Sequence, residues 1–216
     1  MLHQRPPARA VYRSLMIRGV GVADYQWLKA EYGFRDEQLK LYTYNPQPFL
    51  ADKRSAMQSY VTSEPYGIEQ AAGFKPKVFL LADRGYDTYA ATIETRKKLI
   101  AERPSTAQRF IEASIIGWYG YLYGDNAAAN ALIMKDNPDI SGDGIAYAVA
   151  RMKEHGIVDS GDALKLGIGA MTEARVESFF EKMVTAGVQK PSIDWRQAID
   201  TRFVNKGLGK ELHKAG

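Results

Sequence analysis

The chain has 216 residues and 45% hydrophobic content, enough to bury the core of one large domain or of two small ones. Its formal net charge of +4 comes from 29 basic and 25 acidic residues spread along the chain, a distribution that argues against a nucleic-acid groove. The absence of cysteine excludes disulfides, thiolate metal sites and a cysteine nucleophile.

The sequence begins with an arginine-bearing segment that contains one short apolar stretch. That stretch, Leu15-Met16-Ile17, is interrupted by Arg18 and is too short for the hydrophobic region of a secretory signal. No apolar run elsewhere approaches the length of a membrane span. We therefore expect no export signal and no membrane anchor in this sequence.

The first half of the sequence alternates strand and helix patterns. Asp24 and Gly33 bracket one helix as cap and stop, and Pro65 and Gly73 mark the first turn and the end of another. The expected strands cover 14–17, 39–44, 57–62, 78–82 and 89–93, and the expected helices cover 25–32, 48–53 and 64–72. This strand–helix–strand rhythm predicts an α/β protein with a mainly parallel sheet.

After Glu94 the pattern becomes almost entirely helical. Apolar residues recur at helical spacing over 104–123, which makes this the clearest helix of the chain. Further helices are expected over 126–135, 142–155, 173–186 and 195–206. The change in composition predicts a boundary near 86–95, between a strand-rich unit and a helical one.

The junction from Gln58 to Tyr66 is the first candidate for a functional site. An alternating strand there runs into a helix whose first turn carries Glu64 and Tyr66. The carboxyl ends of strands in open α/β sheets are where such folds hold ligands. Tyr66, and Tyr86 beyond a later strand, could stack on a flat ligand and donate a hydrogen bond, or could pack against the sheet instead.

Patterns for catalysis and metal binding are weak in this sequence. His3, His155 and His213 all have structural explanations, and no Gly-x-Ser-x-Gly nucleophile motif is present. The segment 139–150 starts like a calcium loop but has Ala150 where that loop requires a glutamate. We therefore expect a protein that is not an enzyme and that uses no metal and no cofactor.

The segment Gly19-x-Gly21-x-x-Asp24 lies between an expected strand and an expected helix, as a dinucleotide-binding fingerprint does. The third glycine of that fingerprint is missing. The pattern leaves a nucleotide-binding α/β domain open as an alternative, and the free amides of this helix N-terminus could meet a polar or anionic ligand group.

Several segments together resemble the SsuA/THI5-like (NMT1/THI5-like) substrate-binding proteins of ABC transporters. In the first half these segments are 25–34, 48–53, 60–66 and 78–83. The later segments 110–125 and 147–171 resemble the helical C-terminal part of the same family. The resemblance covers about residues 20–208, and Ser63-Glu64-Pro65-Tyr66 is its most specific step.

This resemblance implies a bilobed type II periplasmic-binding-protein fold that closes on a small molecule and delivers it to a membrane permease without chemical turnover. It leaves residues 1–19 unassigned, places the second lobe at 20–90, and makes 91–216 the crossover and a helical part that packs on the first lobe. Members of the broad family handle alkanesulfonates, taurine, nitrate, and pyrimidine precursors of thiamine or riboflavin-like heterocycles. The implied location is periplasmic, with retention in the cytoplasm as the alternative for a chain without a signal.

By position, the resemblance also implies ligand contacts at the turns between strands and helices. The residues at these turns are Tyr25, Gln26, Asn45, Ser63, Glu64, Tyr66, Tyr86 and Asp87. Glu64 would accept hydrogen bonds from the ligand. That role favours an amine or ring N–H group over a sulfonate or nitrate, because like charges in a dry site are costly.

Members of the family are longer than this chain and begin with a signal peptide and most of the first lobe. The resemblance therefore implies a truncated member that carries only half of its binding cleft. The same fold family includes enzymes of thiamine-pyrimidine synthesis, which form the alternative enzyme interpretation. Those enzymes carry a cysteine-rich motif, and this chain has no cysteine.

Overall fold

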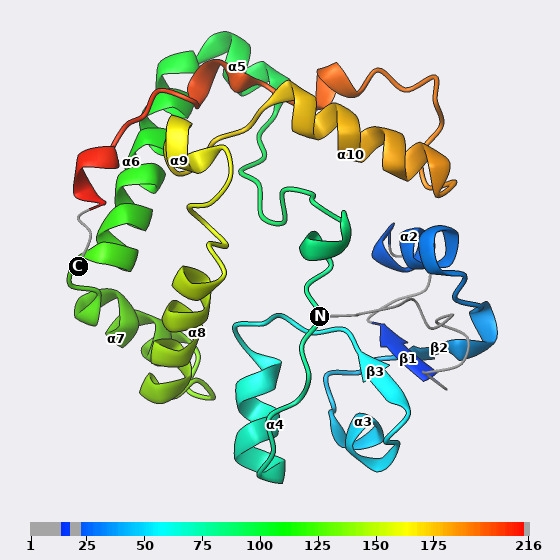
Figure 1. Cartoon of the computed structure of the whole chain (residues 1–216). Helices are drawn as coiled ribbons and strands as arrows, with labels where there is room; N and C mark the ends of the chain where they lie inside the picture. The colour runs from blue at the N-terminus through cyan, green and yellow to red at the C-terminus, as the bar shows by residue number, and fades with distance from the viewer. Residues whose placement is uncertain (1–13, 18–22, 214–216) are drawn as a thin grey trace. The chain divides into compact units, whose positions relative to one another are not determined.

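The computed structural model describes residues 14–17 and 23–213, which form a mixed α/β fold that is mostly helical (Figure 1). The chain divides into two compact units. Unit 1 contains the described residues up to Thr88 together with 177–195, and unit 2 contains 89–176 and 196–213. The lobe identities assigned to 20–90 and 91–216 stay a prediction.

Unit 1 is built on a small parallel sheet. Its strands are β1 Ser14–Ile17, β2 Leu39–Leu41 and β3 Ser55–Met57, in the order β2-β1-β3. The central strand β1 is buried along its whole length, and its Leu15 lies in register with Leu39 of β2 and Ala56 of β3. The predicted α/β class and the parallel pairing are therefore confirmed for this unit.

Short helices connect and follow these strands. They are α2 Ala23–Tyr32, α3 Gln47–Ala51 and α4 Glu64–Ala72. The N–H group of Gly33 donates to the carbonyl of Lys29, and that of Gly73 donates to the carbonyl of Glu69. Both glycines have a positive φ, near 70°, which is why a residue without a side chain ends each helix. The ends predicted at these glycines are confirmed.

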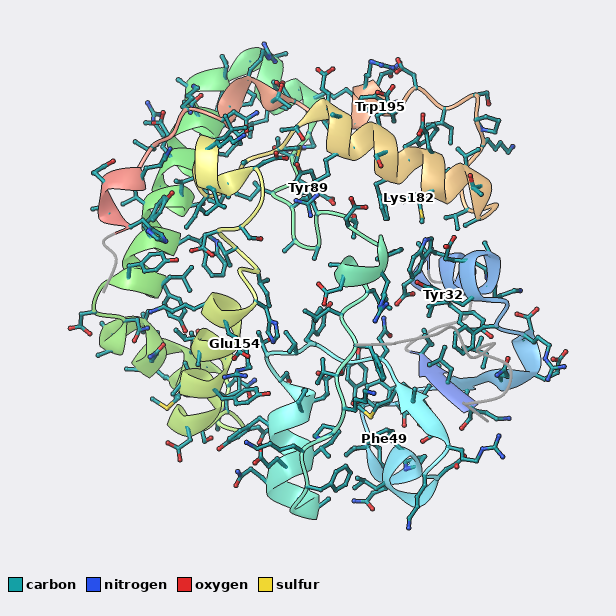
Figure 2. The ribbon with its side chains drawn as sticks, viewed as in Figure 1. Tyr32, Phe49, Tyr89, Glu154, Lys182 and Trp195 are labelled. Atoms are coloured by element: carbon teal, nitrogen blue, oxygen red, sulfur yellow. The ribbon has the colours of Figure 1, made fainter. Side chains whose placement is uncertain are left out.

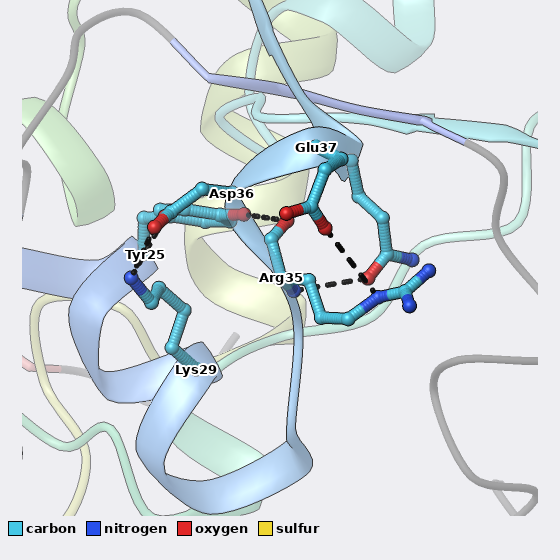
Figure 3. A network of polar contacts seen from close by, with 6 residues as sticks. Tyr25, Lys29, Arg35, Asp36 and Glu37 are labelled. Carbon is cyan, nitrogen blue, oxygen red and sulfur yellow. Dashed lines mark hydrogen bonds and ion pairs between the residues drawn. The ribbon is translucent and has the colours of Figure 1, made fainter.

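The core of unit 1 lies between β1 and α2. Leu15, Ile17 and Tyr25 form a buried cluster, and Tyr25 has no exposed surface. Its hydroxyl donates to the Arg35 carbonyl at 2.7 Å. Lys29 and Asp36 add an exposed ion pair to the same turn, with nitrogen and oxygen 2.7 Å apart (Figure 3). These contacts join α2 to the 3₁₀ turn Asp36–Gln38 that precedes β2.

Three predicted strands of the first half are misplaced or absent. The strand expected over 57–62 is β3, which ends at Met57. No strand forms over 78–82 or 89–93, where Val78 and Ile93 are exposed. A run of apolar residues needs a paired neighbour to become a strand, and neither run finds one among the described residues. The strand expected over 39–44 stops at Leu41, ahead of a positive φ of 64° at Tyr44.

Unit 2 is assembled around one long helix. The helices are α5 Lys97–Glu102, α6 Pro104–Tyr123, α7 Ala127–Asp136, α8 Gly142–Glu154 and α9 Ala163–Leu166. α6 has the predicted bounds. Its Ile115, Tyr119 and Leu122 form the core cluster with Ile168, and Leu208 packs against that cluster. One face of α6 therefore supplies most of the unit's buried apolar surface.

Other helix predictions in the second half are confirmed in part. Ser141 caps α8 as expected, because its hydroxyl accepts a hydrogen bond from the Gly144 N–H group at 3.1 Å. α10 spans Glu173–Thr185, close to the predicted 173–186. The helix expected over 195–206 is wrong, because two 3₁₀ turns, Trp195–Ala198 and Thr201–Phe203, replace it. A third turn covers Lys210–Leu212.

The break between those first two turns has a local cause. Asp200 adopts an extended backbone, and its carboxylate accepts from the Arg202 N–H group, so it starts a new turn instead of continuing a helix. The helices α5 and α9 were not predicted. Within residues 14–17 and 23–213, no helix is both long and apolar enough to cross a membrane.

Candidate functional site

The sheet order places a topological switch point at the carboxyl end of β1. From β1 the chain moves first to β2 on one side and later to β3 on the other. In open α/β sheets the crevice outside such a point is the usual ligand site. Two polar residues follow the strands here: Asp24 in the first turn of α2, and Gln58 directly after β3. The Gln58 N–H group still donates to the Met16 carbonyl of β1, at 2.7 Å.

Asp24 is a buried carboxylate, with 7% of its surface exposed. Its Oδ2 accepts from Gln58 Nε2 at 2.8 Å, and its Oδ1 accepts from the Tyr25 N–H group at 2.8 Å. Burial raises the pKa of Asp24, and these hydrogen bonds only partly offset that rise. In the part of the chain that the structure describes, no lysine or arginine pairs with it.

Tyr86 belongs to the same neighbourhood. Burial, and secondarily the negative charge of Asp24, raise the pKa of Tyr86 to about 12. Its hydroxyl therefore stays protonated at neutral pH and can act as a hydrogen-bond donor. The ring packs at 5.2 Å from Trp27 and edge-on at 5.1 Å from Phe179 of α10, so the aromatic cluster fixes its orientation.

The aromatic cluster continues along α2 and meets an ion pair. Tyr32 packs edge-on against Trp27 at 5.5 Å. Asp87, next to Tyr86, accepts from Lys182 Nζ at 2.6 Å. Figure 2 marks Tyr32 on α2 and Lys182 on α10. Because Lys182 already neutralises Asp87, the predicted ligand contact at Asp87 is an intrachain ion pair in this structure.

The predicted anchor Glu64 is engaged within its own loop. Its Oε2 accepts from the Tyr60 N–H group at 2.8 Å, across the turn that leads into α4. Ser63 is the exposed N-cap of α4 and makes no side-chain capping bond, while Tyr66 is half-buried one turn further on. Glu64 therefore stabilises the entry of α4, and it does so without the burial that distinguishes Asp24.

The remaining predicted contacts have separate structural roles. Asn45 is exposed, and its side-chain oxygen accepts from the Gln47 N–H group at 3.0 Å, which starts α3. Gln26 is half-buried on α2, and Tyr25 lies in the core beneath Asp24. Among the eight predicted residues, Tyr86 is the half-buried polar side chain whose pKa responds to the charge of Asp24.

Neither Asp24 nor Gln58 was among the eight predicted ligand contacts, although Gln58 begins the junction 58–66 that was the first candidate site. Asp24 was interpreted as a helix cap, yet it lies inside α2. Gln58 was placed inside a strand expected over 57–62, because the strand was expected to start at 57, two residues later than it does. Placing the strand at 55–57 would have made Gln58 its first residue beyond the carboxyl end.

Two sequence patterns remain: the calcium-like segment and the glycine fingerprint. The calcium-like segment 139–150 forms the start of α8, and within residues 14–17 and 23–213 no histidine and carboxylate group gathers to hold a metal ion. The Gly19 and Gly21 fingerprint and His3 lie outside the described residues.

Comparison with known proteins found no matching family model, no matching curated protein and no matching solved structure. The candidate site at Asp24 therefore rests on the geometry of this chain.

Proposed function

We propose that this chain is a solute-binding protein that holds a small polar organic molecule at the carboxyl edge of the unit 1 sheet, with Asp24 as the anchor. The observation that carries the proposal is a buried carboxylate, fixed by Gln58 and without a cationic partner among the described residues. Two donors compensate this charge only in part, and a buried charge without a positive partner stays costly. A ligand can supply that partner.

The neighbouring groups define which ligand chemistry fits. Asp24 accepts hydrogen bonds, and the protonated Tyr86 hydroxyl can donate one. The half-buried Tyr86 ring, held in place by the buried Trp27, adds flat apolar surface. The preferred ligand is thus an organic molecule with an amine or ring N–H group beside a flat part. A sulfonate or nitrate would face the like charge of Asp24.

A wider assignment is also part of the proposal. The chain would be the SsuA/THI5-like, type II periplasmic-binding component of an ABC uptake transporter, located in the periplasm and serving a permease without chemical turnover. The parallel strands with their switch point, the helix-rich second half and the resemblance of 60–66 support it. Asp24 takes over the anchoring role that the resemblance gave to Glu64.

Thermal-shift screening of the purified chain tests this proposal. The panel is cytosine, riboflavin, taurine and nitrate, and the protein is wild type, Asp24→Asn and Glu64→Gln. We expect cytosine or riboflavin to raise the melting temperature of wild type, since a ligand at about 100 times its Kd adds about 2.7 kcal/mol. The shift should survive in Glu64→Gln and disappear in Asp24→Asn. A shift by taurine or nitrate alone, or an equal shift in both variants, would overturn it.

A further inference from the structure

Two residues other than glycine have a positive φ in the described part of the chain. They are Tyr44 and Asn205, with a φ of 64° each. Asparagine tolerates this left-handed conformation, and Asn205 also exchanges two hydrogen bonds with the Met171 backbone, at 3.0 Å and 2.7 Å. Tyr44 is a bulky residue, for which the same conformation is strained. Residues kept in strained conformations cluster at ligand sites, which makes Tyr44 a candidate contact.

The Tyr44 ring is supported by a neighbour and open to solvent. Tyr44 is 71% exposed, whereas Tyr42, two positions earlier, is 4% exposed. The two ring centroids lie 5.6 Å apart, with the planes tilted by 40°. The buried Tyr42 therefore holds the Tyr44 ring from one direction, and the exposed part of that ring is a flat surface on which a planar ligand can stack.

Tyr44 follows β2 at the same edge of the sheet as the Asp24 site. The N–H groups of Tyr42 and Gln58 donate to carbonyls of the central strand β1, at 2.8 Å and 2.7 Å, from its two sides. Neighbouring strands lie about 4.8 Å apart, so β2 and β3 lie about 10 Å apart across β1. Gln58 in turn donates to Asp24. A ligand anchored at Asp24 must therefore be longer than a single ring to reach the Tyr44 side of the edge.

We propose that Tyr44 forms a second subsite for the same ligand, on which the far part of a fused-ring heterocycle stacks while Asp24 holds its donor group. This inference rests on the proposed solute-binding function and deepens it by naming the ligand class. The single ring of cytosine is too short to meet both residues, whereas the three fused rings of riboflavin span the edge. The strained backbone of Tyr44 is retained because it presents the ring to the ligand.

Isothermal titration calorimetry with riboflavin and with cytosine measures the contribution of the ring. Tyr44→Ala should weaken riboflavin binding by at least about 5-fold, as expected for the loss of an aromatic ring that stacks on a heterocycle. Cytosine binding should stay within about 2-fold of wild type. Tyr44→Phe keeps the ring and should bind riboflavin within about 3-fold of wild type. The matched control is Phe74→Ala, which removes an exposed aromatic residue of unit 1 that follows α4, and it should also leave binding unchanged.

Thermal denaturation without ligand tests the strain separately. Tyr44→Gly and Tyr44→Ala both remove the ring, but only glycine adopts a positive φ without strain. The glycine variant should therefore melt about 2–4 °C above the alanine variant. Equal melting temperatures would show that the backbone of Tyr44 is unstrained and would overturn the inference.

The binding outcomes separate this inference from the proposed function. If wild type binds cytosine but not riboflavin, or if Tyr44→Ala binds riboflavin as tightly as wild type, the Tyr44 subsite is overturned and the proposed function stands. If Tyr44→Ala weakens cytosine as much as riboflavin, the effect is a general disturbance of unit 1, and the subsite is again overturned. If wild type binds neither compound, the subsite and the proposed function fail together.

Discussion

Two buried polar groups, one in each unit, are satisfied in opposite ways. In unit 2 the Tyr119 hydroxyl accepts from the Ile168 N–H group at 3.2 Å, so a neutral donor and a neutral acceptor satisfy each other inside the core. In unit 1 the group to compare is the charged Asp24, which has donors but no cation among the described residues. The first arrangement stabilises the fold. The second raises its free energy, as expected of a group retained for binding.

The largest expected effect comes from the neutral pair in unit 2. Tyr119→Phe removes the acceptor and leaves the buried Ile168 N–H group unsatisfied, which should lower the free energy of unfolding by about 1–3 kcal/mol. Denaturation by guanidinium chloride measures the change. The matched control is Tyr32→Phe, because in the described part of the chain the Tyr32 hydroxyl makes no hydrogen bond. An equal loss of unfolding free energy in Tyr119→Phe and Tyr32→Phe would contradict a stabilising role for the bond between Tyr119 and Ile168.

A smaller effect of opposite sign is expected in unit 1. Asp24→Asn removes a buried charge and should raise the free energy of unfolding at pH 7, because burial raises the pKa of Asp24 and so disfavours its charged form in the fold. Because the folded pKa of Asp24 lies above the unfolded value, protonation favours the fold. Wild type should therefore gain stability relative to the variant as pH falls from neutrality through the raised pKa towards 3.8.

Urea denaturation at a series of pH values checks this sign. Glu64→Gln is the control, since Glu64 is a carboxylate of the same unit that accepts a hydrogen bond from a more exposed loop. If Asp24→Asn destabilises the protein at pH 7 and this loss shrinks on acidification, the charge of Asp24 stabilises the fold, Asp24 is a structural group, and the contrast between the units fails.

The sequence predicted helices well because their ends depend on neighbouring residues. Gly33, Gly73 and Ser141 terminate or cap helices through contacts within four residues, and each was assigned correctly. Strand positions depend on partners far along the chain. β3 lies where it pairs with β1, not where its own pattern alternates best, and the apolar run at 78–82 has no partner strand among the described residues.

The candidate site was harder to predict for the same reason. The hydrogen bond from Gln58 to Asp24 joins residues 34 positions apart, and the burial of Asp24 follows from the packing of α2 on β1. No local pattern contains either fact. Tyr86 and Glu64 were both predicted from their places near strand ends, but the bond from the Tyr60 N–H group to Glu64 could not be read from the sequence.

The smallest expected effect concerns the ion pair beside the site. Lys182→Met should lower the free energy of unfolding by at most about 1 kcal/mol, because Asp87 and Lys182 are both partly exposed. The loss should shrink in 1 M salt, which screens the pair. Thermal denaturation at low and high salt measures it, with Lys98→Met of the exposed Lys98–Glu102 pair as the control. A loss above 2 kcal/mol would make this pair a structural element of unit 1.

Isothermal titration calorimetry of wild type and Asp24→Asn, with whichever of cytosine or riboflavin binds better, tests the central claim most directly. Loss of a hydrogen bond to a buried charge corresponds to about 1.5–3 kcal/mol, so the variant should bind about 10- to 100-fold more weakly. Glu64→Gln should bind within about 3-fold of wild type, a difference of about 0.7 kcal/mol. Equal affinity of wild type and Asp24→Asn would contradict Asp24 as the anchor of the site.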